Sequence, residues 1–142
     1  MSFVLPDTSV WVSLIRRGTK EEAIRRGLRG RALYLSSVVV HELYRGCRTE
    51  EDWRDIDFIR QSFDAAKRIV APTFQSWYEA ANILGRYSRV HGSVNWNDHL
   101  LDILILLCAV QLRARVLTLN VADFNRWNQL IPAGRRVRVQ AL

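Results

Sequence analysis

The sequence predicts an α/β fold in which a central parallel sheet of four to five strands is covered by helices on both faces. Short apolar segments typical of strands alternate along the chain with longer segments of helical periodicity, and this alternation is typical of parallel sheets. The composition is that of an ordinary globular domain, since 49% of the 142 residues are hydrophobic and 25% are charged. We expect one domain over residues 1–142.

The first half of the chain is expected to form, in order, a strand over residues 2–5, a helix over 10–15, a strand over 32–35 and helices over 36–46 and 52–68. The polar run Asp7-Thr8-Ser9 marks the turn after the first strand. Ser36 and Ser37 are candidate N-caps of the helix over residues 36–46. The last helix carries Trp53, Phe58 and Ile59, which belong either to the core or to a surface that binds a partner.

The second half is expected to form a strand over residues 69–72, helices over 73–90 and 97–113, a strand over 116–119 and a last strand over 137–139. The first of these helices places Phe74, Trp77, Ala81 and Leu84 on one side. The second contains the unbroken apolar run from Ile103 to Val110. Ligands of parallel sheets gather beyond the carboxyl ends of the strands, so the residues that follow the strands are the first candidates for a site.

The apolar run is far shorter than the roughly 20 residues of a membrane-spanning helix, and residues 1–10 lack the pattern of a signal peptide. We therefore expect a cytoplasmic protein that does not bind a membrane. Cys47 and Cys108 have no metal-binding spacing and are expected to be reduced core residues.

The formal net charge is +7, and the basic residues concentrate in two places. The first cluster is Arg16, Arg17, Lys20, Arg25, Arg26, Arg29 and Arg31, and the second is Arg135, Arg136 and Arg138. A nucleic-acid backbone is the commonest partner for such a surface, although a solvated face or an acidic protein partner gives the same pattern.

Four carboxylates stand where this fold is expected to have a site. Asp7 follows the first strand, Glu42 lies on the helix after the second, Asp102 lies in the apolar helix, and Asp123 follows the fourth strand. In a doubly wound sheet the turns after the first and fourth strands lie together, so these residues would converge. Each also has a purely structural interpretation, since Asp7 and Asp123 are typical caps and Glu42 is a typical exposed helix residue.

Asp102 is the most informative of the four, because its helix is apolar on nearly every side. A buried carboxylate without a partner is strongly disfavoured, so Asp102 requires a cation, either an arginine of the fold or a metal ion in a cleft. Asp98 lies one turn earlier on the same face. It is a candidate for a supporting role, but we favour a position at the start of the helix, where the dipole stabilises negative charge.

Carboxylates without an accompanying set of histidines or cysteines favour a hard cation, Mg²⁺ or Mn²⁺, which also binds phosphate oxygens. The three histidines form no zinc motif. The chain also has no phosphate-binding P-loop, no dinucleotide-binding glycine motif and no GxSxG serine motif.

Four motifs, VLPDTSVW, LSSVVVHELYRG, DILILLCA and VLTLNVADF, follow one another in this order. Together they resemble the PIN-domain ribonucleases of the VapC toxin type, from Phe3 to about Val139. The resemblance implies a PIN-like fold and an acidic quartet that holds Mg²⁺ or Mn²⁺, namely Asp7, Glu42, Asp102 and Asp123. It implies supporting roles for Thr118 and Asn120. Pro6 and the amide of Asn120 depart from the commoner pattern, and the amide would weaken binding of a second metal ion.

The resemblance further implies an endoribonuclease that is toxic when free, is neutralised by a VapB-type antitoxin and forms a homodimer. The expected reaction is hydrolysis of an RNA phosphodiester by a metal-activated water. The expected path of the RNA follows the arginines of the first basic cluster, namely Arg16, Arg17, Arg25, Arg26 and Arg29.

Two alternatives stay open, a PIN-type nuclease of RNA processing without an antitoxin and a non-catalytic module that binds nucleic acid. A phosphoryl-transfer enzyme with Asp7 as nucleophile is disfavoured, because Ser9 stands where the second aspartate of such enzymes is usual.

Overall fold

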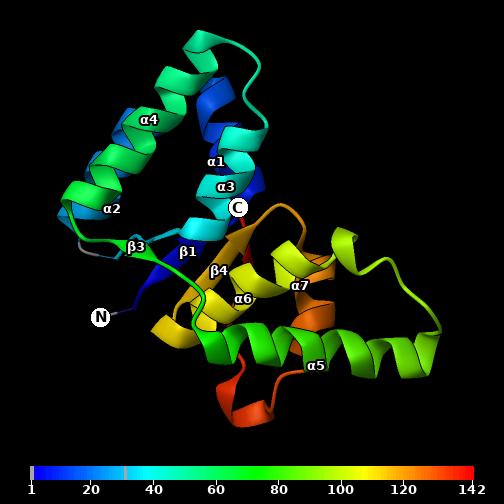
Figure 1. Cartoon of the computed structure of the whole chain (residues 1–142). Helices are drawn as coiled ribbons and strands as arrows, with labels where there is room; N and C mark the ends of the chain where they lie inside the picture. Colours follow the sequence, from blue (N-terminus) through cyan, green and yellow to red (C-terminus); the bar gives the residue numbers. More distant parts are fainter. Residues whose placement is uncertain (1, 31) are drawn as a thin grey trace.

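The computed structural model describes residues 2–30 and 32–142 and confirms the α/β class (Figure 1). Arg31, which belongs to the first basic cluster of the sequence, lies outside the described residues. The elements are, in chain order, β1 (Val4–Pro6), α1 (Thr8–Arg17), α2 (Lys20–Arg29), β2 (Leu35–Ser36), α3 (Ser37–Arg45), α4 (Glu50–Ala65), β3 (Ile69–Val70), α5 (Phe74–His91), the 3₁₀ helix η1 (Trp96–Asp98), α6 (Leu100–Leu112), β4 (Arg115–Thr118), α7 (Val121–Asn128), the 3₁₀ helix η2 (Ala133–Arg135) and β5 (Val139–Ala141).

All strand pairs in the described part of the chain are parallel, but they divide into two sheets. One has the order β1-β4-β5 and the other pairs β2 with β3. A single bridge between Val4 and Leu33 connects them, supported by a 3.0 Å hydrogen bond from the Tyr34 N–H to the Val4 carbonyl. The strands therefore follow one another across the molecule in the order β3-β2-β1-β4-β5.

Hydrogen-bonding side chains define where several helices begin. Ser36 accepts from the Val38 N–H and caps α3, as the sequence predicts. The helix predicted to begin at residue 52 begins two residues earlier, because Thr49 and Asp52 form a reciprocal capping box. The helix α1 ends at Arg17, and Gly18 after it has a φ of 68°, the left-handed conformation that glycine adopts without steric cost.

The helix α6 is the centre of the core, and its residues from Ile103 to Ala109 are all buried. It begins at Leu100 rather than at residue 97, because η1 precedes it. In Figure 1, α1 to α4 form the upper part of the molecule and α5 to α7 the lower part. Across the upper part, the rings of Trp11 and Phe63 meet edge to face, with centroids 5.5 Å apart.

The helix α5 presents a different side to the core from the one that its aromatic pattern suggested. Its buried residues include Ala80, Ile83 and Leu84, whereas Phe74 and Trp77 point outward and are 86% and 51% exposed. Both sides of this helix carry large apolar residues, so periodicity alone does not identify the buried side.

Both cysteines are free thiols: Cys108 is buried in the core, and Cys47 is half buried and packs against it. None of the helices in the described part of the chain combines the length and the hydrophobicity that crossing a bilayer requires.

Candidate active site

The parallel pairing of β1 with β4 brings Asp7 and Thr118 together at one edge of the sheet. Asp7 follows β1 directly, and its backbone N–H donates to the carbonyl of Leu117 in β4 over 2.9 Å. The Thr118 hydroxyl, at the end of β4, donates to the Asp7 Oδ2 over 2.7 Å. Two residues separated by 111 positions in the chain are therefore in direct contact.

The Asp7 carboxylate is only 3% exposed and is held from several directions. Its Oδ1 accepts from the Ser9 hydroxyl at 2.5 Å and from the Val10 N–H at 3.3 Å. The Ser9 hydroxyl in turn accepts from the Leu119 N–H at 3.1 Å, beyond the end of β4. Asp7 is thus the N-cap of α1, and this structural role leaves its proposed place in the site open.

Glu42 reaches the same region from α3 and is held by the first residue of α1. The Thr8 hydroxyl donates to the Glu42 Oε1 over 2.7 Å, and Arg45 lies 3.9 Å from the Oε2. In the sequence, Thr8 and Ser9 stood out only as part of the polar run that marks the turn after the first strand. The signal that could have found them is their position directly after Asp7, where a hydroxyl can orient a carboxylate.

Asp102 occupies the first turn of α6, half buried against the core. Burial raises the pKa of its carboxyl to about 6, and the negative charges of Glu42, Asp7 and Asp123, in this order, add to the effect. Among the described residues no arginine forms an ion pair with Asp102, so the arginine-pairing alternative has no support in the structure. The other three carboxylates are close enough to act on Asp102, and no cation of residues 2–30 or 32–142 forms an ion pair with it.

Asp123, Asn120 and Asp98 lie nearer the surface. Asp123 is half exposed in the first turn of α7 and pairs with Arg126 at 3.3 Å. Asn120 is exposed, and its backbone N–H donates to the Thr118 hydroxyl over 2.8 Å. Asp98 is exposed in η1, just before α6, in agreement with a position at the start of that helix.

The described residues of the first basic cluster lie on α1 and α2, and all of them except Lys20 are exposed. Arg16 lines a cleft of about 240 Å³ together with Thr8 and Glu42, and Arg17 borders a neighbouring hollow next to Arg16 and Ser9. The other described residues of the cluster lie on α2, where Arg29 is exposed, Arg25 and Arg26 pair with Glu22, and Lys20 is buried against Asp55 at 2.9 Å. Packing therefore removes Lys20 from the exposed basic residues, and Glu22 compensates part of the charge of Arg25 and Arg26.

No three His, Cys, Asp or Glu side chains of the described residues are arranged closely enough to hold one metal ion together as they stand. Carboxylates without a cation repel one another, and this repulsion favours separated side chains. The candidate ligand atoms are nevertheless those of a hard-cation site, because all are carboxylate oxygens. The raised pKa of Asp102 shows the effect of the negative charge that they bring together. A cation would remove the electrostatic cost of bringing them together.

The sequence matches the PIN domain family over residues 4–127, and the chain belongs to this family. PIN domains are nucleases, so the chain is assigned to the hydrolases that act on nucleic acids. No curated protein matches the sequence significantly.

Solved structures with the same fold include chains of toxin–antitoxin complexes. The match to a chain of the DNA-bound VapBC complex from Salmonella typhimurium has a TM-score of 0.69 and 20% identity, and covers 99% of this chain and 98% of that chain. A chain of the DNA-bound VapBC2 complex from Rickettsia felis matches with a TM-score of 0.66 and 18% identity, covering 99% and 98%. A chain of FitAB bound to an IR36 DNA fragment matches with a TM-score of 0.60 and 19% identity, covering 98% and 94%. These likenesses confirm the PIN fold over almost the whole chain.

The Asp102→Asn variant is expected to be more stable than the wild type in metal-free buffer at pH 7, by roughly 1 to 3 kcal/mol in the free energy of unfolding. The folded-state pKa of about 6 lies above the ordinary value of 3.8, so folding disfavours the charged carboxyl. The gain should be absent below about pH 4, grow between about pH 4 and 6, and remain constant above that range. Urea unfolding in EDTA measures it.

The exposed Asp98 provides the matched control, because Asp98→Asn removes the same charge outside the carboxylate cluster and should change stability little at any pH. Equal stabilities of the wild type and Asp102→Asn at pH 7 would contradict an uncompensated charge at Asp102.

Proposed function

We propose that this chain is a cytoplasmic endoribonuclease that depends on Mg²⁺ or Mn²⁺ and is the toxin of a toxin–antitoxin pair. The observation that carries the proposal is the group formed by Asp102 and three neighbouring carboxylates, gathered at the carboxyl edge of the sheet in a PIN domain. A nuclease must bring an anionic phosphodiester to this negative cluster, and a hard divalent cation makes that approach favourable.

Asp7, Glu42 and Asp102 would hold the ion, and the half-exposed Asp123 would complete its surroundings from the rim. A bound Mg²⁺ would supply Lewis acidity that activates water and neutralises charge on the scissile phosphate. The chain itself positions two of these carboxylates in advance through hydrogen bonds. Thr118 and Ser9 hold Asp7 from both of its oxygens, and Thr8 holds one oxygen of Glu42.

The rim of the cluster provides groups for orienting the attacking water. Asp123 can accept a hydrogen bond from that water, since Arg126 contacts only its Oδ1. The exposed amide of Asn120 can donate or accept one, because no side-chain cap occupies it at the start of α7. These two residues are therefore assigned to the chemical step rather than to binding of the RNA.

Electrostatics near the cluster favour a nucleic acid as the substrate. The net charge is +7, and Arg16 and Arg17 border hollows that also contain Glu42 and Ser9. Phosphates drawn by these two arginines would lie next to the carboxylates. Arg25, Arg26 and Arg29 lie on the exposed surface of α2 and would extend the attraction over a longer RNA.

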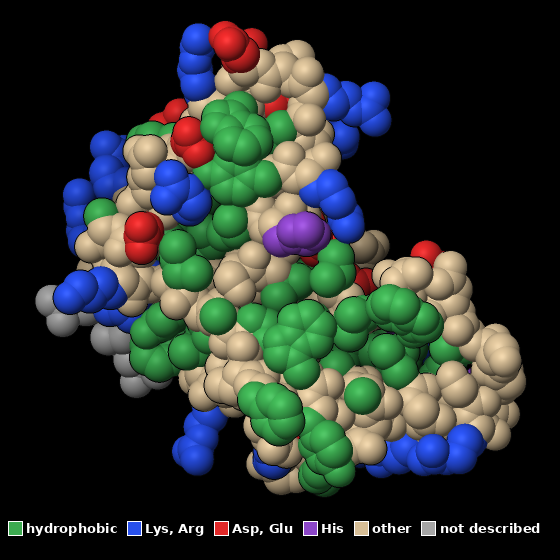
Figure 2. Space-filling model, viewed as in Figure 1, with side chains coloured by type: hydrophobic (Ala, Val, Ile, Leu, Met, Phe, Trp, Pro, Cys, Tyr) green, Lys and Arg blue, Asp and Glu red, His purple; other side chains and the backbone are tan. Residues whose placement is uncertain are grey.

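The assignment of an antitoxin and of a homodimer rests on fold-level analogy and on exposed apolar surface. The VapBC neighbours are complexes of two proteins, and we propose that this chain likewise binds a VapB-type antitoxin. Figure 2 shows hydrophobic side chains gathered over α4 and along α5. Trp53 and Phe58 are half exposed on α4, whereas Ile59 is part of the core. We assign the α4 surface to the antitoxin, and Phe74, Trp77 and Tyr78 of α5 to the second copy.

The central prediction is that the purified protein cleaves RNA with Mg²⁺ or Mn²⁺ and that EDTA abolishes cleavage. Asp7→Asn and Asp102→Asn should each lower the cleavage rate at least about 100-fold while the protein remains folded, because each removes one charge from the cation site with little change in volume. A panel of tRNAs and rRNA analysed on denaturing gels, with circular dichroism of each variant, measures both effects.

Asp98→Asn is the matched control and should cleave RNA at close to the wild-type rate. Full activity in both site variants would contradict the assignment of the cluster. Normal RNA binding without cleavage under any metal would instead favour a non-catalytic module.

The arginines are expected to contribute unequally to RNA binding. The double variant Arg16→Gln/Arg17→Gln should weaken binding of unrelated RNAs to a similar degree and flatten the salt dependence, because phosphate contacts carry no base information. Arg25→Gln/Arg26→Gln should have a smaller effect, since the single carboxylate of Glu22 already compensates part of their charge. Fluorescence anisotropy in EDTA at two salt concentrations compares the RNA affinities of the two double variants. Equal losses of affinity would place the RNA path along α2 as well.

The assembly proposal predicts a dimer in light scattering that Trp77→Glu converts to monomer. Trp96→Glu is the matched control, because Trp96 is 55% exposed but lies outside α5. A monomer at high protein concentration would contradict the dimer.

The antitoxin proposal predicts that expression of the chain arrests growth and that co-expression of a small protein encoded next to it relieves the arrest. Growth arrest that no neighbouring protein relieves would favour a nuclease without an antitoxin.

A further inference from the structure

A second cationic feature lies at the opposite end of β4 from the carboxylates. A cavity of about 740 Å³ is lined by Arg113 and Arg115, which flank the start of β4, and by Arg135, Arg136 and Arg138 of the C-terminal segment. We call this cavity the arginine pocket. Arg115 and Thr118 are the first and last residues of β4, so about 10 Å of strand separates the pocket from the nearest residue of the carboxylate site.

Most of the positive charge of the arginine pocket is uncompensated. Among the described residues, Arg135 is the only one of the five arginines with a carboxylate partner, Glu79 at 3.0 Å. Arg136 donates only to the backbone carbonyls of Ile131 and Gln129, which carry no net charge. Five guanidinium groups around one cavity repel one another, so this arrangement favours an anionic ligand.

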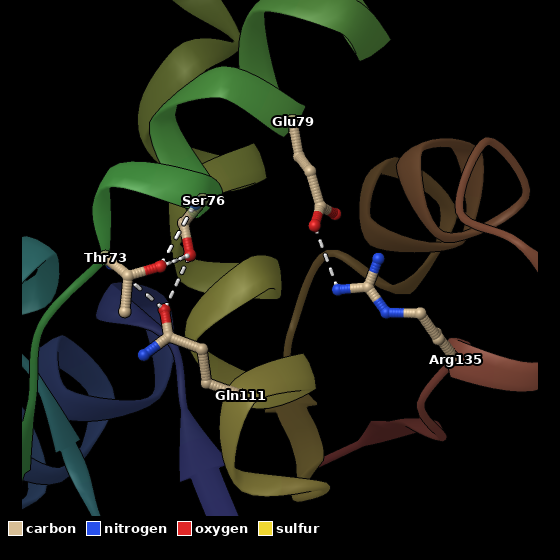
Figure 3. A network of polar contacts seen from close by, with 5 residues as sticks. All are labelled: Thr73, Ser76, Glu79, Gln111 and Arg135. Atoms are coloured by element: carbon tan, nitrogen blue, oxygen red, sulfur yellow. Dashed lines mark hydrogen bonds and ion pairs between the residues drawn. The ribbon is translucent and has the colours of Figure 1, made fainter.

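The walls of the pocket are fixed by polar contacts to α5 (Figure 3). Gln111, which lines the pocket, accepts from the Ser76 hydroxyl at 2.7 Å and from the Thr73 N–H at 3.3 Å. Arg135 is held by Glu79 on the same helix. The two sides of the cavity, formed by the end of α6 and the segment around η2, are thus attached to one helix and need little ordering when a ligand binds.

Arg113 adds an independent observation from the backbone. Its φ of 53° lies in the left-handed region, at the end of α6, where glycine or asparagine is usual. An arginine in this conformation costs stability that a glycine would not. A cationic side chain held there at the edge of the cavity is consistent with a binding role.

We propose that the arginine pocket binds phosphate groups and is a second anion site, separate from the carboxylate cluster. Guanidinium groups pair with phosphate oxygens through two parallel hydrogen bonds, and several of them around one cavity suit a ligand with adjacent phosphates. The volume lies in the range of small-molecule sites. Free oligophosphates and the RNA backbone share this chemistry. The proposal does not depend on the nuclease assignment, because it requires neither the carboxylates nor a metal ion.

Isothermal titration of inorganic triphosphate into the metal-free protein in EDTA tests the site directly. The wild type should bind, and Arg113→Gly and Arg115→Gln should each weaken binding by about 10-fold to 100-fold. Lys67→Gly is the matched control, since Lys67 is an exposed cation with a φ of 56° after α4 and lies outside the pocket. Both glycine variants should melt at or above the wild-type temperature, because each relieves left-handed strain.

A loss of affinity in Arg113→Gly without a loss of thermal stability would therefore report binding and not folding. Absence of binding at millimolar triphosphate, or equal affinities of Arg113→Gly, Arg115→Gln and Lys67→Gly, would overturn the proposal. A competition with labelled RNA in EDTA distinguishes the sources of phosphate. If triphosphate displaces RNA and Arg113→Gly weakens this displacement, the RNA backbone is the ligand. If triphosphate binds without displacing RNA, the ligand is a free oligophosphate.

Discussion

The parallel pairing of β1 with β4 is the constraint on which the rest of the site depends. Because both strands run in the same direction, Asp7 and Thr118 leave the sheet at one edge, where the hydroxyl of the second donates to the carboxylate of the first. The same pairing lets Ser9 bridge Asp7 to the backbone beyond β4. An antiparallel arrangement would place these residues at opposite ends. The register of two short strands therefore assembles a site from the two ends of the chain.

The second requirement is a rigid support for a charge that the core disfavours. The buried residues of α6 fix this helix, and Asp102 lies on its first turn, where the helix reaches the other carboxylates. Burial and three neighbouring negative charges raise its pKa, so the arrangement costs stability without a cation. The protein thus tolerates a loss of folding stability at the position to which we assign its chemistry. Such a trade-off between stability and activity is usual at functional sites.

The alternation of strands and helices, the apolar helix around Asp102 and the turn after the first strand were predictable, because local periodicity and capping residues determine them. Tertiary packing determined what the sequence did not indicate. Lys20 belonged to a basic run but is buried against Asp55, and Phe74 belonged to an apolar stripe but faces outward. The roles of Thr8 and Ser9 and the arginine pocket depend on contacts between distant segments, which neither spacing nor composition reveals.

The central claim is that the carboxylate cluster around Asp102 is a site for a hard divalent cation. Nuclear magnetic resonance titration of the Asp102 side-chain carboxyl, with and without Mg²⁺, tests it most directly. We expect a pKa of about 6 without the ion and a pKa well below the ordinary range with it, because a bound cation stabilises the charged form. A pKa that Mg²⁺ and Mn²⁺ leave unchanged at millimolar concentration would contradict the account.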